Sequence, residues 1–419
     1  MGAAGAAWFP SGEVARAAKD APATRLVGIE GMRAVAAGSV LLYHVWLYSA
    51  PGGRSVDLGA LTKVFDNLRA GVTLFFVLSG FLLFRPYVAA ALRGTASPSL
   101  RQYLRNRALR ILPAYWVILL VVALVFEHQL LRAPEQLVAN AFLVHDYVAS
   151  YIFGPGIVPA WSLAIEVVFY VCVPLLGAAA ILLARRGRLS PVWAALVPVL
   201  FMVALGWGSK AAVHVFQLGR VWAVSFPVHA DWFAGGMSLA VLRVLWEDGR
   251  LRLPRFWRLP ALAVALIVGA LAAHAYYAGQ LSYIEYQTPI VVSCTIALAL
   301  VVLAEPGSKL VYVLTRRPIV AAGLASYSVF LWHDPLLRFL RVHDLTWAGR
   351  QGFLLNVAVV AALTAVLSTL SYRLVEKPAL SRKRSWQRGE PAGAPDQGAQ
   401  PQHQELPSAA GAVAGVVNP

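Results

Sequence analysis

Apolar runs of about 20 residues recur along this chain, and they constrain its fold more than any other feature. A run of this length crosses a hydrocarbon core of about 30 Å as a helix, and backbone in lipid must satisfy its hydrogen bonds internally. Charged residues make up only 13% of the 419 positions, against about 25% in soluble domains. The sequence therefore predicts an all-α, polytopic integral membrane helix bundle.

We expect about ten transmembrane helices. Their approximate ranges are 31–50, 70–92, 108–131, 157–183, 192–217, 224–242, 259–279, 287–304, 318–337 and 352–372. The sixth range fits least well because it contains His229 and Asp231. Most Lys and Arg residues fall in alternate connecting segments, as short cytoplasmic loops do. The net charge of +16 therefore indicates orientation rather than nucleic-acid binding, with both termini in the cytoplasm.

Three regions follow from this pattern. Residues 1–27 lack a signal-peptide core and are predicted to be a cytoplasmic segment, and residues 28–378 form the transmembrane domain. Residues 379–419 are rich in Pro, Gly, Gln and Ala without periodicity, and they are predicted to be a disordered cytoplasmic tail. Cys172 and Cys294 both lie in apolar runs, so we expect neither a disulfide nor a metal site. Any chemistry must occur in or at the membrane.

The first span contains two ionisable residues, Arg33 and His44. Such groups are costly in a bilayer and usually face a cavity or a partner. Eleven residues at about 100° each return to nearly the same helix face, so both side chains point the same way, about 16 Å apart along the axis. This suits a long anionic ligand that enters from the cytoplasm with its reactive end at His44. The alternative is that Arg33 reaches lipid phosphate and His44 is a packed hydrogen-bonding residue.

Two further spans carry polar groups to a similar depth. Glu166 lies about two turns into the fourth span, and His333 lies in the outer half of the ninth, followed by Asp334. A carboxylate beside an imidazole fixes its tautomer and raises its basicity, as a general base requires. The structural alternatives are that Glu166 pairs with a basic residue and that His333 serves a helix kink at Asp334-Pro335.

Arginines cluster between the second and third spans. Arg107 and Arg110 are neighbours on one helix face, and a guanidinium group matches phosphate oxygens; ordinary positive-inside charge is the alternative. Ser79 lies in the stretch GVTLFFVLSGFLLF. It is a weak candidate nucleophile because no adjacent base accompanies it, and the small Ser79-Gly80 pair favours close helix packing instead.

Taken together, these segments resemble the membrane acyltransferase type 3 family, whose members acylate sugars of lipopolysaccharide, peptidoglycan, exopolysaccharide and macrolide antibiotics. The resemblance covers most of residues 28–378. It rests on six segments: Arg33 and His44 with ten residues between them, FFVLSGFLL at 75–83, Arg107 and Arg110 followed by Ile-x-Pro-x-Tyr, WSLAIEVVFY at 161–170, YSVFLWHDP at 327–335, and VEKP at 375–378.

The resemblance implies roles for the matching residues. His44 would be the essential histidine and Glu166 the acidic position of the fourth span. Three arginines would bind the acyl donor: Arg33, Arg107 and Arg110. Supporting roles are expected for Ser79, Trp161 and His333. Residues 28–378 would then be an acyltransferase domain, and the chain would belong to the branch without a C-terminal hydrolase-like domain.

The resemblance also implies the partners. The co-substrate would be acyl-CoA, with acetyl-CoA as the default, and no metal would be needed. The acceptor would be a hydroxyl of a cell-surface glycan, a glycolipid or a macrolide sugar. A multi-pass protein of this kind would lie among the lipids of the bacterial cytoplasmic membrane.

Two mechanisms fit these residues. His44, assisted by Glu166, could remove the acceptor proton while the hydroxyl attacks the thioester, or the acyl group could pass through an acyl-histidine. A different class of function is a transporter or exporter of a lipid-linked or small-molecule substrate. Transporters often contain an internal repeat of broken helices, and the Arg33/His44 pattern of the first span has no counterpart in the sixth.

Overall fold

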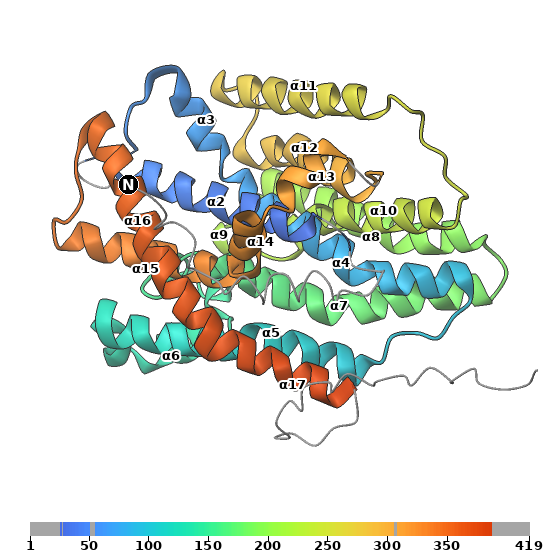
Figure 1. Ribbon diagram of the computed structural model, residues 1–419, viewed down its shortest axis with the longest axis horizontal. Coiled ribbons are helices and arrows are strands. Elements are labelled where there is room, and N and C mark those ends of the chain that lie inside the picture. The colour runs from blue at the N-terminus through green and yellow to red at the C-terminus, as the bar shows by residue number, and fades with distance from the viewer. Residues whose placement is uncertain (1–25, 27, 51–54, 306–307, 388–419) are drawn as a thin grey trace, which may run out of the picture.

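The computed structural model describes residue 26 and residues 28–50, 55–305 and 308–387. Within these ranges the chain forms helices and connecting loops, with no β-strand element (Figure 1). The predicted all-α class is therefore confirmed. Residues 379–387, the start of the predicted disordered tail, are helical within α17 (Lys377–Gln387). The rest of that tail and nearly all of the predicted N-terminal segment lie outside the described residues.

Each of the ten predicted spans overlaps one long helix of the described chain, although the ninth, 318–337, also covers the short helix α14 (Arg317–Leu324). These are α2 (Ile29–Tyr48), α4 (Ala70–Arg93), α5 (Leu100–Val121), α7 (Ala160–Arg185), α8 (Pro191–Val215), α10 (Ala230–Glu247), α11 (Arg258–Tyr277), α12 (Tyr283–Val302), α15 (Ser326–Val342) and α16 (Gly349–Ser371). Shorter helices connect or flank them: α3 (Thr62–Asn67), α6 (Pro134–Ala141), α9 (Arg220–Ala223), α13 (Lys309–Leu314), α14 (Arg317–Leu324) and α17 (Lys377–Gln387).

Seven helical segments of the described residues are long and apolar enough to cross a membrane, and they contain α4, α5, α7, α8, α11, α12 and α16. The remaining three of the ten, α2, α10 and α15, carry ionisable residues within their length. Ionisable groups inside a membrane protein face its interior rather than lipid. The chain is thus a multi-pass membrane protein, and ionisable groups occur both on these three helices and within apolar segments, as Glu166 does on α7.

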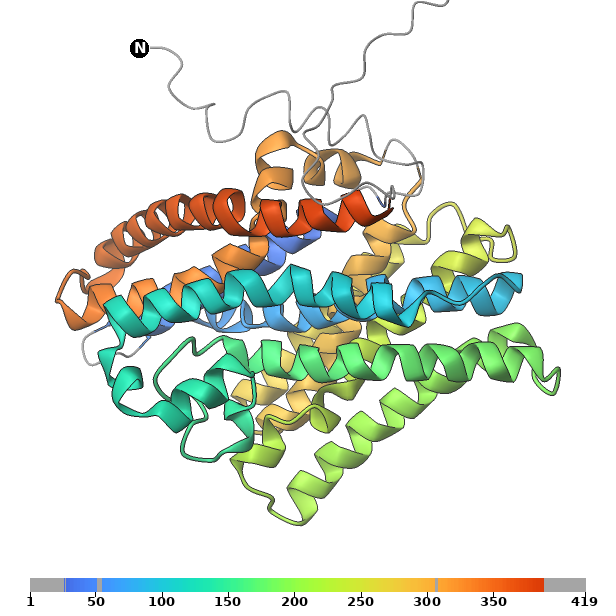
Figure 2. The same ribbon diagram turned by 90° about the horizontal axis from the view of Figure 1, so that it is seen from below.

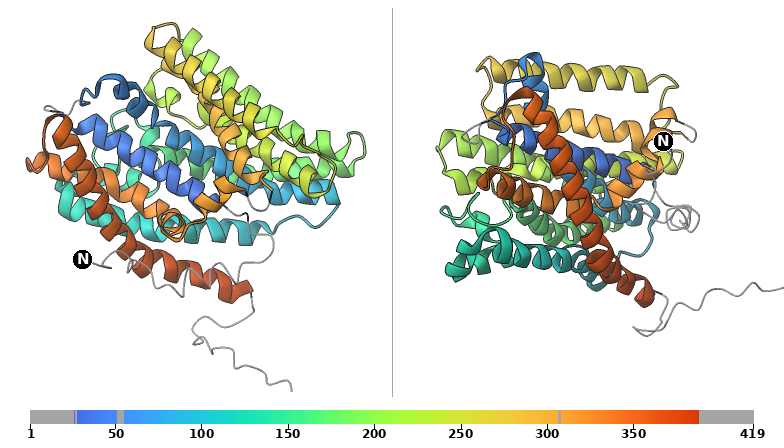
Figure 3. Two further views of the ribbon diagram at one scale, coloured as in Figure 1. Left: turned by 45° about the horizontal axis from the view of Figure 1, so that its top comes forward. Right: turned by 60° about the vertical axis from the view of Figure 1, so that its left-hand side comes forward.

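The helices form one bundle around α2 and α4. In Figure 1, α11 and α12 lie along one edge and α5 and α6 lie toward the opposite edge. α7 runs beside α4 and α5 (Figure 2). α16 continues through the π-helical turn η6 (Tyr372–Glu376) into α17, which makes a long helical path across the bundle (Figure 3). This path contacts α5, so the end of the domain reaches the predicted donor-binding arginines.

Two glycines allow α4 and α10 to pack closely. A Cβ atom at Gly80 would overlap the carbonyl of Phe233, and a Cβ atom at Gly236 would overlap the carbonyl of Val77. Small residues at such crossings bring helix backbones together in membrane proteins. The close packing predicted from Ser79-Gly80 is therefore realised at Gly80.

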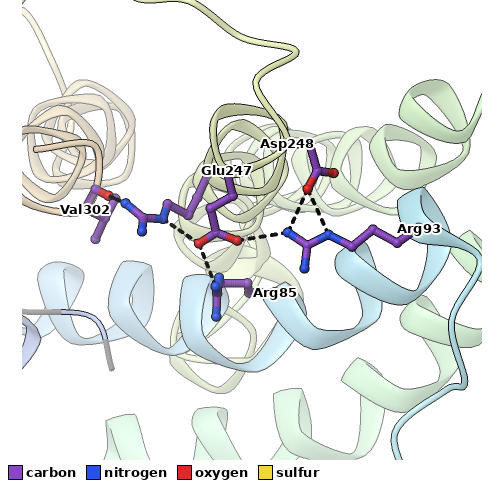
Figure 4. Close-up of polar contacts among 6 residues, drawn as sticks. Arg85, Arg93, Glu247, Asp248 and Val302 are labelled. Atoms are coloured by element: carbon purple, nitrogen blue, oxygen red, sulfur yellow. Dashed lines mark hydrogen bonds and ion pairs between the residues drawn. The ribbon is translucent and has the colours of Figure 1, made fainter. Parts of the chain in front are cut away.

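A network of ion pairs joins the predicted cytoplasmic ends of α4, α10 and α12 (Figure 4). The Glu247 carboxylate lies 2.6 Å from Arg85 Nη2, 3.1 Å from Arg93 Nη2 and 2.7 Å from Arg243 Nε. Arg93 also pairs with Asp248 at 2.9 Å. Arg243 in turn donates a hydrogen bond to the Val302 carbonyl. These contacts join α4, α10 and α12 to one another at their predicted cytoplasmic ends.

Candidate active site

A cavity of about 790 Å³, including its opening, lies among α2, α4, α5, α7 and α15. Its charged lining consists of Arg33, Arg107, Arg110 and Glu166. Phe75 and Phe330 belong to its apolar lining. The structure thus brings together all three arginines predicted to bind the donor, although they come from two separate helices.

The cavity carries an excess of positive charge, because three arginines face one carboxylate. Arg107 Nε and Arg110 Nη2 are buried without a hydrogen-bond acceptor among the described residues. The Arg107 guanidinium also lies 5.8 Å from the centre of the Tyr170 ring. Buried donors need acceptors, and guanidinium groups favour phosphate oxygens. The arrangement is suited to an anionic ligand.

Glu376 forms an ion pair with Arg110 from outside the cavity lining. Its carboxylate is 2% exposed, accepts a hydrogen bond of 2.5 Å from the Ser328 hydroxyl, and lies 3.9 Å from Arg110 Nη1. This glutamate belongs to the VEKP segment at 375–378, and no role was predicted for it. An acidic residue at the end of the last span could have indicated a functional position. Its contact with α5 is made from the end of the π-helical turn η6.

Glu166 lies with the arginines rather than beside His44. It lines the cavity and accepts a hydrogen bond from the Ser79 hydroxyl, which links α7 to α4. Its depth along α7 could be counted from the sequence, but the direction in which it points depends on how α7 packs. The structure therefore places Glu166 and Ser79 in the lining of the arginine-containing cavity; the catalytic role predicted for Glu166 stays a prediction.

His44 pairs with His333. His44 Nδ1 lies 3.1 Å from His333 Nε2, and the two ring centroids are 4.9 Å apart. The sequence placed both histidines in the outer half of their spans, and the structure brings their rings into contact. His44 is half-buried and His333 is 1% exposed, so neither histidine projects freely into lipid.

The hydrogen bonds of this pair indicate one arrangement of protons. His333 Nδ1 lies 3.1 Å from the Val329 carbonyl, which can only accept, so Nδ1 carries the proton and Nε2 of a neutral ring accepts. His44 Nδ1 faces that acceptor and also the Val40 carbonyl, at 2.9 Å. It must therefore be the protonated nitrogen, as inferred from the network. This leaves the lone pair of His44 on Nε2, where a general base needs it.

Asp334 is the carboxylate nearest in sequence to this pair, and its charge acts on both rings. It is fully buried and lies 3.0 Å from Arg338 Nε one turn further along α15. Arg338 also lies 2.5 Å from Glu127 and donates to the Gly156 carbonyl. A helix kink was one interpretation of Asp334-Pro335. In the structure, α15 continues through these residues to Val342.

Trp161 makes ring contacts with His229 and Phe153. Its ring centroid is 5.7 Å from that of His229 and 6.4 Å from that of Phe153. The next two residues of α7, Ser162 and Leu163, line the cavity. Trp161 therefore packs at the start of the helix that carries Glu166, and its predicted supporting role would be exerted through that helix.

The sequence of this chain is similar to those of several bacterial O-acetyltransferases. The peptidoglycan O-acetyltransferase OatA of Listeria monocytogenes is 26% identical over 379 residues, which cover 84% of this chain and 55% of that protein. The putative peptidoglycan O-acetyltransferase YrhL of Bacillus subtilis is 26% identical over 373 residues, with 84% and 54% covered. The O-acetyltransferase OatA of Staphylococcus aureus is 24% identical, with 84% and 57% covered.

The chain spans about half the length of these relatives. No solved structure matches it. A profile of the acyltransferase domain family matches residues 26–373, a range that includes every cavity-lining residue and both histidines. The chain therefore belongs to the acyltransferase domain family.

Proposed function

We propose that this protein is a membrane O-acyltransferase that moves an acyl group from acyl-CoA to a hydroxyl of a sugar-containing acceptor, with His44 as general base. One observation carries the proposal: an arginine-lined cavity and a histidine with a free Nε2 lone pair occupy successive levels of the same helix, α2. Family membership favours acyl transfer over transport.

The donor would enter at the arginines. The phosphates of coenzyme A are anionic, and Arg107 and Arg110 present buried donors without acceptors among the described residues. Charge-assisted hydrogen bonds to such groups are stronger than neutral ones. Arg33 also lines the cavity, from α2, and His44 follows it along the same helix. The pantetheine arm would follow α2 toward the histidine pair.

At His44 the reaction would be a direct transfer. His44 Nε2 takes the proton of the acceptor hydroxyl while the hydroxyl oxygen attacks the thioester carbonyl. The new C–O bond forms, the C–S bond breaks, and the coenzyme A thiolate leaves and takes up a proton. His333 holds the tautomer of His44 through the contact at 3.1 Å. A positioned base of this kind contributes about 10²–10⁴-fold to rate.

The acceptor class is proposed from the relatives, which are named for peptidoglycan or for O-acetylation. A glycan hydroxyl is consistent with a multi-pass protein of the bacterial cytoplasmic membrane. Soluble peptidoglycan fragments are accordingly the first acceptor to use in an assay, with a macrolide sugar and a glycolipid as comparison substrates.

The test uses the full chain in lipid nanodiscs with radiolabelled acetyl-CoA and peptidoglycan fragments. Label should pass to the glycan, and His44→Gln should abolish the transfer while its affinity for coenzyme A persists. Retained turnover in His44→Gln would remove His44 from catalysis. Rapid-quench samples without acceptor separate the two mechanisms, because label that stays on wild-type protein but not on the His44 variant indicates an acyl-histidine.

A further inference from the structure

The donor cavity and the histidine pair are separated by an aromatic side chain. Phe330 lines the cavity and precedes His333 by three residues, which places both on one face of α15. The ring centroids of Phe330 and His333 are 5.9 Å apart. Phe330 therefore contacts the cavity on one side and the histidine pair on the other.

The position of this ring is fixed by its neighbours. Phe330 is 8% exposed, and its ring meets that of Phe75 edge to face, with centroids 5.7 Å apart and planes at 75°. Phe75 also lines the cavity and lies one turn before Ser79 on α4. Edge-to-face pairs are favourable beyond their burial, by about 0.5–1.5 kcal/mol. Two helices, α4 and α15, thus contribute one rigid aromatic barrier.

This barrier limits the space available to an acyl group whose carbonyl lies at His44. The thioester end of a donor that extends from the arginines must reach the histidines past Phe330, so the acyl chain shares that space with the aromatic ring. Packed protein interiors accommodate added methylenes poorly. An acetyl group adds one methyl to the carbonyl, whereas each longer chain adds methylenes against the ring.

We propose that Phe330, backed by Phe75, restricts the donor to short acyl groups, so that this protein selects acetyl over longer acyl chains. The inference rests on the proposed function, since it assumes that the thioester reaches His44 from the cavity. It assigns Phe330 to donor specificity and leaves the proton transfer to His44.

The experiment measures kcat/KM for acetyl-, propionyl-, butyryl- and hexanoyl-CoA in wild type, Phe330→Ala and Phe330→Leu. One methylene in an apolar pocket changes kcat/KM by about 10–200-fold. We expect the butyryl-to-acetyl ratio to rise at least about tenfold in Phe330→Ala, with a smaller rise in Phe330→Leu. Affinity for coenzyme A itself should stay unchanged, because the arginines are untouched.

Phe84→Ala is the matched control, because Phe84 is a fully buried phenylalanine of α4 outside the cavity lining. Its butyryl-to-acetyl ratio should equal that of wild type. An unchanged ratio in the Phe330 variants, or an equal rise in the control, would overturn the inference. If Phe330→Ala is inactive with every donor, the ratio in Phe330→Leu decides. Failure of the proposed function is distinguishable, since it appears as no transfer from acetyl-CoA by wild type, or as full activity in His44→Gln.

Discussion

His333 Nε2 accepts from His44 Nδ1 across 3.1 Å, although the two residues are 289 positions apart in the sequence. The contact joins α2 to α15 and involves Nδ1 of His44, whereas the proposed mechanism uses Nε2. A partner at this nitrogen determines where the lone pair of the other nitrogen lies. The pair therefore predicts unequal roles for its two members.

His333→Ala should lower kcat while leaving the KM for the donor nearly unchanged, because His333 positions His44 and lies outside the cavity lining. The expected loss is smaller than the loss of about 10²–10⁴-fold for a missing general base in His44→Ala. His333→Gln should recover part of the activity, since its amide oxygen can accept from His44 Nδ1. Equal losses in His44→Ala and His333→Ala would contradict this division.

Glu376→Gln should raise the KM for acyl-CoA with little change in kcat, because Glu376 orients Arg110 without lining the cavity. Removing a buried charge partner leaves Arg110 less constrained. Initial rates across a range of donor concentrations give both parameters. Ser328→Ala, which removes the hydroxyl that holds Glu376, should show a weaker effect in the same direction; a change confined to kcat in both variants would argue for a different role.

Gly236→Ala should destabilise the bundle strongly, since the new methyl would overlap the backbone of α4 at Val77. Overpacking of this kind costs about 1–3 kcal/mol or more. Gly208→Ala in α8 is the matched control, because no atom lies within 4 Å of a Cβ there and alanine is the better helix former. Thermal unfolding in detergent should show a lower Tm for the first variant and an equal or higher Tm for the second.

The connecting segment after α6 contains a buried pair with opposite pH responses. Burial raises the pKa of Asp146 to about 7 and lowers the pKa of His145 to about 4. His145 Nε2 and Asp146 Oδ1 lie 3.5 Å apart. Asp146 contributes stability at low pH that is lost as pH rises toward 7. His145 contributes stability that is lost as pH falls from about 6.5 toward 4. The two slopes oppose each other between pH 4 and 6.5.

In Asp146→Asn only His145 still makes stability depend on pH in this pair. The stability of this variant relative to wild type should therefore rise with pH between about 4 and 6.5. His145→Gln should do the reverse and fall relative to wild type as pH approaches 7. Tm measured from pH 4 to 8 in the same detergent checks both. Parallel Tm curves for the three proteins would mean that the pair does not titrate in this range.

Much of this architecture could be predicted from the sequence because helices are regular. A period of 3.6 residues placed Arg33 and His44 on one side of α2, and the structure directs one to the cavity and the other to His333. Arg107 and Arg110 followed from the same periodicity on α5. Apolar length likewise predicted the seven segments that are long and apolar enough to cross a membrane. These properties depend on single helices, whose geometry does not depend on their neighbours.

The lateral contacts could not be predicted in this way. Glu166 was expected at a depth similar to that of His44, whereas it lines the cavity with Arg33 and accepts a hydrogen bond from Ser79, a contact that depends on how α7 packs against α4. Glu376 ends a π-helical turn and lies 3.9 Å from Arg110, and π-turns occur often at functional sites. Asp334 directly follows His333 in the sequence, but its ion pair with Arg338 was not predicted.

The contact between Glu376 and Arg110 also bears on biogenesis. Arg110 enters the membrane early in synthesis, whereas its carboxylate partner leaves the ribosome only after the final span has been made. A nascent chain therefore carries an uncompensated guanidinium until translation is nearly complete. Quality control that recognises unpaired charge within lipid could thus distinguish a truncated chain from a finished one.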